Sequence, residues 1–217
     1  MASDQANMNV DQQAALAAAN MDGLKKKLNA ASWSNHMEDI MKAWGEKAAG
    51  LRWIHNKNAG SWKAFSDKLS LWAIFLTTVS STASLATAGL EDSAGVMYGI
   101  GALGMIASLI QSVKKFYNAE EKAADHAAVA KQFGSYYRYM TLQMGMSRED
   151  RKASDLLTDW ALAEYERLQQ ESPSVSGKSI AAYRKEFPDT ENMPDVAEDE
   201  FIISIQGRTT QMPTFSD

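Results

Sequence analysis

The chain has 217 residues, no cysteine and a formal net charge of -5 at pH 7. This length suffices for one domain with tails, and the lack of cysteine excludes a disulfide framework, a thiolate metal site and a cysteine nucleophile. The acidic balance, without a long block of Lys or Arg, disfavours nucleic acid as a partner. The polar, Ala- and Gln-rich start lacks the features of a secretory signal, and we expect residues 1–21 to form a flexible, disordered or weakly helical segment.

Apolar residues recur at steps of three and four from Trp33 to Trp72, which indicates one face of a long helix. The stripe consists of Trp33, Met37, Ile40, Trp44, Ala48, Leu51, Ile54, Asn58, Trp62, Phe65, Leu69 and Trp72. Gly60–Ser61 is the position where we expect this helix to break or bend.

Two uncharged arms, residues 69–90 and 94–113, follow this helix. About 20 residues at about 1.5 Å rise per residue span a bilayer core of about 30 Å. We therefore predict a transmembrane helical hairpin that turns at residues 91–93. The alternative is a buried hairpin in a soluble helical bundle, but a soluble helix normally carries charges along its outer face and neither arm does.

Aromatic and basic side chains flank the arms where lipid headgroups are expected. These interface anchors are Trp62, Lys63, Lys68, Trp72, Lys114 and Lys115. The residues between the arms include Glu91 and Asp92 and no basic residue. The positive-inside rule therefore predicts a multi-pass membrane protein with both termini in the cytoplasm.

The first arm is rich in hydroxyl groups, and the second arm is rich in glycine. The hydroxyl positions singled out are Thr77, Ser80, Ser81, Ser84 and Thr87. They form either a helix-packing face or the polar wall of a pore built from several hairpins. The glycines Gly95, Gly99 and Gly104 predict close helix packing, against the first arm or against another copy of the chain.

A second amphipathic helix follows Lys115, and we expect it to pack antiparallel to the first long helix as a stalk. Its stripe is Phe116, Glu120, Ala123, Ala127, Ala130, Phe133, Tyr137, Met140 and Met144. A membrane domain of residues 22–146 results, and the fold class is all-α.

A third helix is expected over residues 147–172, because Ser147 resembles an N-cap and Ser172–Pro173 ends it. Its expected apolar positions are Leu156, Trp160, Ala163 and Leu168. Residues 173–217 read as an acidic, partly irregular tail, with a short helix at Ser179–Phe187 and a strand-like run at Phe201–Ile205.

The three histidines form no recognised metal motif, since no two lie one helical turn apart. We expect His55 and His126 to be structural and to mark equivalent points on the two stalk helices. The sequence carries no nucleophile elbow, phosphate loop or dinucleotide fingerprint, so we expect neither an enzyme nor a metal or other cofactor.

The order of Trp53, His55 and Lys57, the two arms, and then Phe116, Glu120 and His126 resembles the SLATT superfamily of two-helix membrane proteins. These six positions carry the resemblance. It implies helical extensions in the cytosol and a self-associating, pore-forming or membrane-perturbing effector, as proposed for bacterial members.

The stretch Glu171–Val175 looks like the branch of such proteins found in large DNA viruses. That likeness implies a structural anchor in the internal membrane of a virus particle, with the C-terminal tail docking on capsid or other membrane-associated proteins. The bilayer and further copies of the chain are the other expected partners. The effector, the anchor and the soluble bundle remain open at this stage.

Overall fold

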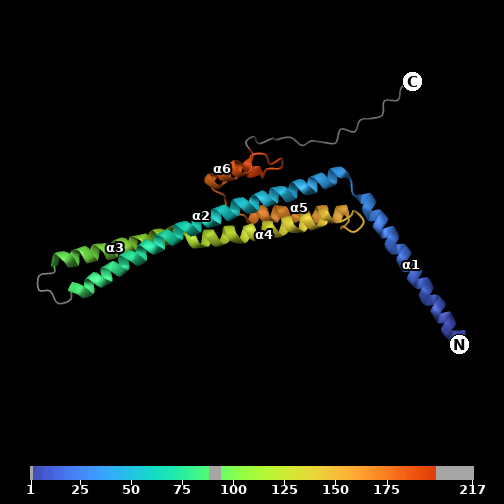
Figure 1. Ribbon diagram of the computed structural model, residues 1–217, viewed down its shortest axis with the longest axis horizontal. Helices are drawn as coiled ribbons and strands as arrows, with labels where there is room; N and C mark the ends of the chain where they lie inside the picture. The colour runs from blue at the N-terminus through green and yellow to red at the C-terminus, as the bar shows by residue number, and fades with distance from the viewer. Residues whose placement is uncertain (1, 88–93, 199–217) are drawn as a thin grey trace, which may run out of the picture.

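The computed structural model describes residues 2–87 and 94–198 (Figure 1). The fold is all-α, as predicted, and the described residues contain no strand. The elements are α1 (Ala2–Ser32), α2 (Asn35–Thr87), α3 (Ala94–Tyr117), α4 (Ala119–Gly145), α5 (Ser154–Glu171), α6 (Gly177–Glu186) and the 3₁₀ turn η1 (Asp195–Ala197).

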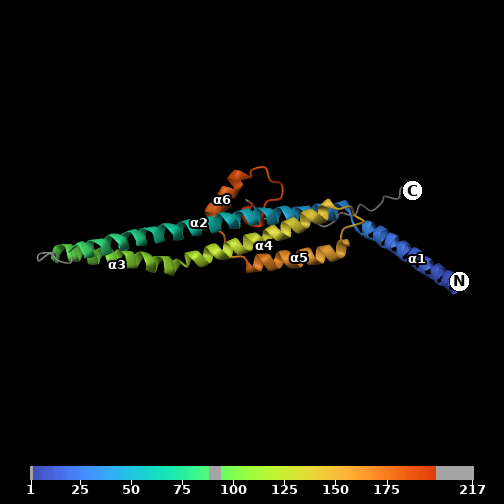
Figure 2. The same cartoon turned by 60° about the horizontal axis from the view of Figure 1, so that its bottom comes forward.

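The molecule is built along α2, which runs the length of the hairpin and of the helical bundle beside it (Figures 1 and 2). One end of α2 pairs with α3, and the other end pairs antiparallel with α4. Helix α5 lies beside α4 and α2, while α6 sits on α2 and α1 projects away from the bundle. The hairpin and the antiparallel stalk predicted from the sequence are both present.

Three local features differ from the sequence-based expectations. The segment expected to be flexible or weakly helical lies within α1, which begins at Ala2, in keeping with the high helix propensity of its alanines. Helix α2 passes through Gly60–Ser61 without a break, and the Ser61 hydroxyl donates to the Lys57 carbonyl at 2.9 Å. The third helix begins at Ser154 rather than at Ser147, because the Ser147 hydroxyl donates to Asp150 within a turn instead.

One further feature was absent from the sequence analysis. Asn118 separates α3 from α4 and has a φ of 47°, in the left-handed region. It is the only non-glycine residue with positive φ in the described ranges. Asn tolerates this conformation better than most residues because its side chain is short and polar. The break lets α4 leave the direction of α3.

The stalk core is formed by α2, α4 and α5, with Trp33 contributing just before α2. Its buried members are Trp33, Met41, Ala48, Leu51, Val129, Phe133, Tyr136, Met140, Leu157, Ala161, Tyr165 and Leu168. The predicted faces are only partly right. On α4 the core includes Val129 and Tyr136, which are not in the predicted stripe. Phe116, the first residue of that stripe, lies near the end of α3 and is 81% exposed. On α5 the expected Leu156 is exposed, and the adjacent Leu157 is buried in its place.

The described part of the C-terminal segment is folded onto α2. Ile54, Tyr183 and Ala197 form a second buried cluster. The approach is closest at Gly50, where an added Cβ would lie 2.5 Å from Cγ of Pro194. The short helix predicted near Ser179 is present as α6. The predicted turn at residues 91–93 and the strand-like run Phe201–Ile205 lie outside the described residues.

Candidate functional site

The α2–α3 hairpin exposes its apolar side chains. In the most apolar 18-residue stretch of each long helix, only 6% of the residues are buried. The exposed large apolar residues of the arms are Leu71, Trp72, Ile74, Phe75, Val79, Leu85, Val96, Met97, Tyr98, Met105, Ile106, Leu109 and Val113. Both helices are therefore long and apolar enough to cross a membrane, and their apolar surface faces outwards.

The two arms contact each other along a narrow seam of small side chains. Ala73 of α2 and Ala107 of α3 are the buried residues of this seam. Across it, the Ser80 hydroxyl donates to the Ile100 carbonyl at 3.1 Å. Such a seam lets two helices approach closely where no larger core is available.

The hydroxyl groups of the first arm fall into two classes. Thr77 donates to the Ala73 carbonyl at 2.7 Å and Thr87 donates to the Ala83 carbonyl at 3.0 Å, so each bonds one turn back in its own helix. Together with Ser80, these hydroxyls are satisfied inside the hairpin. Ser81 and Ser84 are exposed, and their hydroxyls bond to no residue of the described part of the chain.

The glycines of the second arm face open space in the part of the chain that the structure describes. A Cβ added at Gly95, Gly99 or Gly104 would meet no atom within 4 Å. Among the described residues no part of the first arm approaches these glycines closely, and packing within one chain and packing against another copy both stay predictions. Helix α3 turns Ala107 towards α2, so these glycines lie on its open flanks.

The predicted interface anchors surround the junction between hairpin and stalk. Lys114 of α3 connects α2 with α4: its Nζ lies 2.8 Å from the Ser70 hydroxyl of α2 and 2.6 Å from the Glu120 carboxylate of α4. The Lys122 ammonium lies 4.6 Å from the ring centroid of Trp62. The remaining anchors, Lys63, Lys68, Trp72 and Lys115, are exposed around this junction.

His55 of α2 and His126 of α4 meet in the middle of the stalk, as the sequence predicted. Their Nδ1 atoms are 2.9 Å apart, and the residues are only 1% and 2% exposed. The Phe133 ring stacks on His55 with centroids 5.8 Å apart. A hydrogen bond between two ring nitrogens needs one donor and one acceptor, so at least one ring must be neutral.

The surroundings keep this pair uncharged at neutral pH. Burial lowers the pKa of His55 to about 4, and repulsion from His126 adds to the effect. Burial also lowers the pKa of His126, although Asp125 acts in the opposite direction. Within residues 2–87 and 94–198, no three potential ligands come together around a metal position.

The other positions of the resemblance are dispersed. Trp53 packs edge-on against Tyr183 of α6 at 5.7 Å between centroids, and the Lys57 ammonium lies 5.7 Å from the same indole. Phe116 points outwards at the junction, where Glu120 bonds Lys114. The structure thus brings together the two histidines and, separately, Trp53 and Lys57, but it does not gather the six residues at one site.

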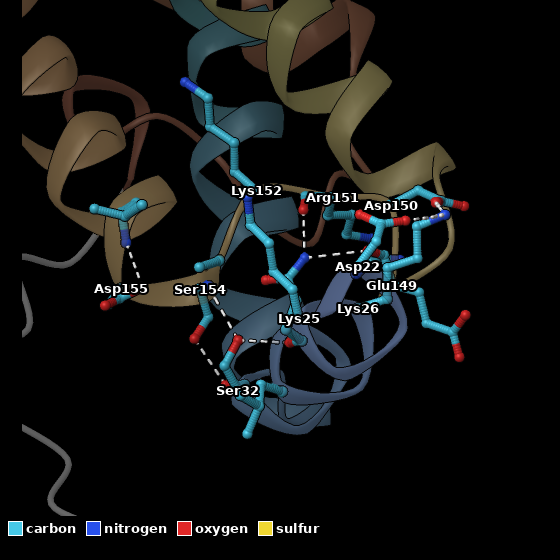
Figure 3. A pocket seen from close by; sticks show the side chains of 14 residues that line it. Asp22, Lys25, Lys26, Ser32, Glu149, Asp150, Arg151, Lys152, Ser154 and Asp155 are labelled. Atoms are coloured by element: carbon cyan, nitrogen blue, oxygen red, sulfur yellow. Dashed lines mark hydrogen bonds and ion pairs between the residues drawn. The ribbon is translucent and has the colours of Figure 1, made fainter. Parts of the chain in front are cut away.

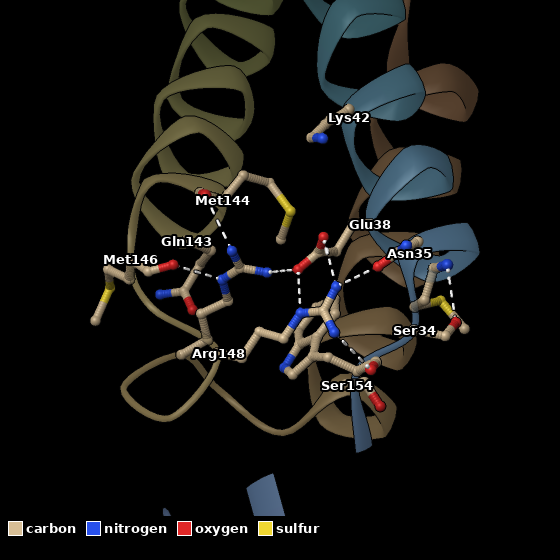
Figure 4. A network of polar contacts seen from close by, with 12 residues as sticks. Ser34, Asn35, Glu38, Lys42, Gln143, Met144, Met146, Arg148 and Ser154 are labelled. Carbon is tan, nitrogen blue, oxygen red and sulfur yellow. Dashed lines mark hydrogen bonds and ion pairs between the residues drawn. The ribbon is translucent and has the colours of Figure 1, made fainter. Parts of the chain in front are cut away.

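A charged clamp at the far end of the stalk was missed by the sequence analysis. Glu38 of α2 receives hydrogen bonds from Arg148, at 2.9 and 3.1 Å (Figure 4). It also receives a hydrogen bond from Arg151. These bonds, above all those from Arg148, lower the pKa of Glu38 to about 2. Arg151 is only 9% exposed. The clamp ties the α4–α5 turn to the start of α2, and only the pair of arginines three residues apart hinted at it.

In the comparisons with known proteins, no family model, no curated protein and no solved structure matches this chain. The resemblance to the SLATT superfamily therefore remains a prediction from the motif order.

Proposed function

We propose that this chain is a non-enzymatic two-pass membrane protein that holds a helical stalk on a bilayer. The observation that carries the proposal is the outward-facing apolar surface of the α2–α3 hairpin. Burying one large apolar side chain is worth about 1.5–3 kcal/mol. Leaving about a dozen of them in water would forfeit far more than the net stability of a typical domain.

The composition around the hairpin supports a membrane in preference to a soluble bundle. The core helix of a soluble bundle buries its apolar face against several neighbours. In the hairpin, by contrast, the arms of α2 and α3 pack against each other and against no other described helix. The hydroxyls of Thr77, Thr78 and Thr82 bond to carbonyls of their own helix, which removes their cost in lipid.

The same proposal gives an orientation. The basic residues Lys63, Lys68, Lys114 and Lys115 gather at the stalk end of the hairpin, and the positive-inside rule assigns that end to the cytoplasm. From Asn35 to Leu69, α2 extends about 50 Å at 1.5 Å per residue. The far end of the stalk, where α4 ends and α5 begins, therefore lies well clear of the headgroups.

Flotation of the purified protein with liposomes, followed by alkaline extraction, tests this proposal. Met105 is 66% exposed on α3 and Leu142 is 61% exposed on α4. An arginine near the centre of a membrane helix costs about 2.5–3.5 kcal/mol. Met105→Arg should reduce the extraction-resistant fraction at least tenfold, and Leu142→Arg should leave it unchanged. Equal behaviour of the two variants, or failure of the unaltered chain to float, would contradict the proposal.

A second candidate function is a pore assembled from several hairpins, as in the proposed role of SLATT effectors. It is favoured by the unbonded, outward hydroxyls of Ser81 and Ser84, which another copy of the hairpin could enclose around water. Ion leak from liposomes should then be lost in the Ser81→Leu/Ser84→Leu variant. Thr78→Val/Thr82→Val, which alters hydroxyls bonded to their own helix, serves as the matched control.

The leak measurement also separates the pore from the structural anchor. Leak that rises steeply with protein density and is abolished only in the serine variant supports the pore. Membrane insertion with no leak supports an anchor that presents its stalk and C-terminal segment to neighbouring proteins, including those of a virus particle.

A further inference from the structure

We propose that α1 is a dimerisation element that pairs with α1 of a second copy as an antiparallel coiled coil. The proposal concerns a helix outside the hairpin and does not depend on the proposed membrane function.

The contacts that the structure describes between α1 and the rest of the bundle lie at the C-terminal end of α1. Asn29 Nδ2 donates to the Arg148 carbonyl at 3.3 Å. The Ser154 hydroxyl donates to the Ser32 carbonyl at 2.7 Å (Figure 3). Lys26 adds an ion pair to Asp150 at 3.5 Å. From there α1 leaves the bundle (Figures 1 and 2). These contacts fix the direction of α1, and the rest of the helix has no partner within the described chain.

The exposed side of α1 carries a regular apolar stripe. The stripe consists of Val10, Ala14, Ala17, Met21, Leu24 and Leu28. Its steps are four, three, four, three and four residues, the spacing of the core positions in a coiled coil. The four larger members are 57–71% exposed. An isolated helix gains nothing from such a stripe, whereas a facing helix with the same spacing would bury it.

The sizes of these residues favour an antiparallel partner. In the antiparallel register centred on residue 19, Val10 faces Leu28, Ala14 faces Leu24 and Ala17 faces Met21. The last two layers, and their symmetry copies, pair a large side chain with an alanine, which gives even packing along the seam. A parallel partner would instead place Ala14 and Ala17 against themselves in two adjacent thin layers.

The charge distribution favours the same direction. Residues 1–24 contain three acids and no Lys or Arg, whereas Lys25, Lys26 and Lys27 follow directly. A parallel pair would set the two lysine clusters side by side. An antiparallel pair sets each cluster beside the acidic half of the other helix, so the partner that fits α1 best in both shape and charge is α1 itself.

The bilayer is a poorer partner for this stripe. Helix α1 begins its exposed run beyond the end of the stalk, about 50 Å along α2 from the first membrane arm. Lipids around the hairpin of the same copy therefore do not reach it.

Disulfide crosslinking in the full chain tests the pairing and its direction. The chain contains no cysteine, so Val10→Cys and Leu28→Cys each introduce a single thiol. When one variant carries an added tag and the two are mixed and oxidised, we expect a crosslinked heterodimer and little crosslinking of either variant with itself. Self-crosslinking of each variant alone would indicate a parallel pair and overturn the proposed direction. No crosslinking in any mixture would overturn the pairing.

A matched pair of substitutions shows whether the stripe causes the crosslink. Leu24 lies on the stripe and Leu16 lies off it, and both are exposed, at 57% and 65%. In the crosslinking background, Leu24→Asp should lower the heterodimer yield at least tenfold, and Leu16→Asp should leave it unchanged. Equal yields in the two backgrounds would refute the role of the stripe. Because this readout does not involve lipid insertion, it stands whether or not the chain floats with liposomes.

Discussion

Acidification should loosen the stalk through its buried histidine pair. The pKa of His55 is 6.5 in an exposed chain and about 4 in the folded stalk, so the unfolded state binds more protons between these values. Stability should therefore be complete above pH 6.5 and be lost as the pH falls towards 4. The full shift corresponds to about 3 kcal/mol, which we reduce to about 2 kcal/mol because solvent screens part of the penalty in so thin a bundle.

The structural reason is the direct contact between the two rings. Once one ring is protonated, its charge is held in an apolar site beside Phe133, and a second proton would remove the acceptor of the 2.9 Å hydrogen bond. The carboxylate of Asp125 near His126 softens the penalty but does not abolish it, because burial lowers the pKa of His126 all the same.

Thermal unfolding of the reconstituted protein, followed by circular dichroism from pH 7.5 to pH 4, measures this effect. A loss of about 2 kcal/mol should lower Tm by about 4–8 °C. The control is His55→Phe/His126→Leu, which replaces both partners by apolar groups and should lack this part of the pH dependence. If the double variant and the unaltered chain lose Tm equally between pH 6.5 and pH 4, the argument is refuted.

Substitutions at three further places probe the clamp, the docked C-terminal segment and the helix break. Glu38→Gln should cost about 2 kcal/mol in urea unfolding, because it leaves Arg148 and the nearly buried Arg151 without their carboxylate; a change below about 0.5 kcal/mol would discount the clamp. Gly50→Ala should speed hydrogen exchange in α6, because the new Cβ meets Pro194. The control Gly60→Ala, whose Cβ would meet no atom within 4 Å, should leave this exchange unchanged. Equal exchange in the two variants would argue against close docking of the C-terminal segment on α2. Asn118→Val should destabilise by about 1–2 kcal/mol and Asn118→Gly should not, since only the former opposes a φ of 47°; the same thermal assay reports both.

The pH window of the clamp is distinct from that of the histidines. The pKa of Glu38 falls from 4.5 to about 2 in the folded chain, so its contribution is present above pH 4.5 and is lost as the pH falls towards 2. The histidine effect occurs almost entirely above that range. A single pH series can therefore separate the two sites.

The long elements were predictable because their signals are large and local. Two uncharged runs of about 20 residues predict a helical hairpin, whether it lies in a membrane or in a bundle. A hairpin brings the helices on either side of it next to each other. That geometry explains why His55 and His126, 71 residues apart in the sequence, could be expected at equivalent heights. The hydroxyls of Thr77 and Thr87 likewise bond within their own helix, a local rule that needs no knowledge of the fold.

The remaining features depend on contacts that no local pattern encodes. Ser147 has the chemistry of an N-cap, yet its hydroxyl bonds Asp150 in a turn that Arg148 and Arg151 hold against α2. On α5, Leu156 and Leu157 are equally apolar, and only the position of α4 and α2 decides that Leu157 is buried. The sequence predicted that helices would form, but their facing sides were decided by their neighbours.

The most direct test of the membrane hairpin is thiol accessibility in sealed vesicles. The chain has no cysteine, so Met105→Cys and Leu142→Cys each give one reactive site at similarly exposed positions of the isolated fold. With a membrane-impermeant maleimide, a spanning hairpin predicts labelling of Leu142→Cys in outward-facing stalks and none of Met105→Cys until detergent is added. Labelling of both variants at the same rate before detergent would contradict the account and return the chain to the class of soluble helical bundles.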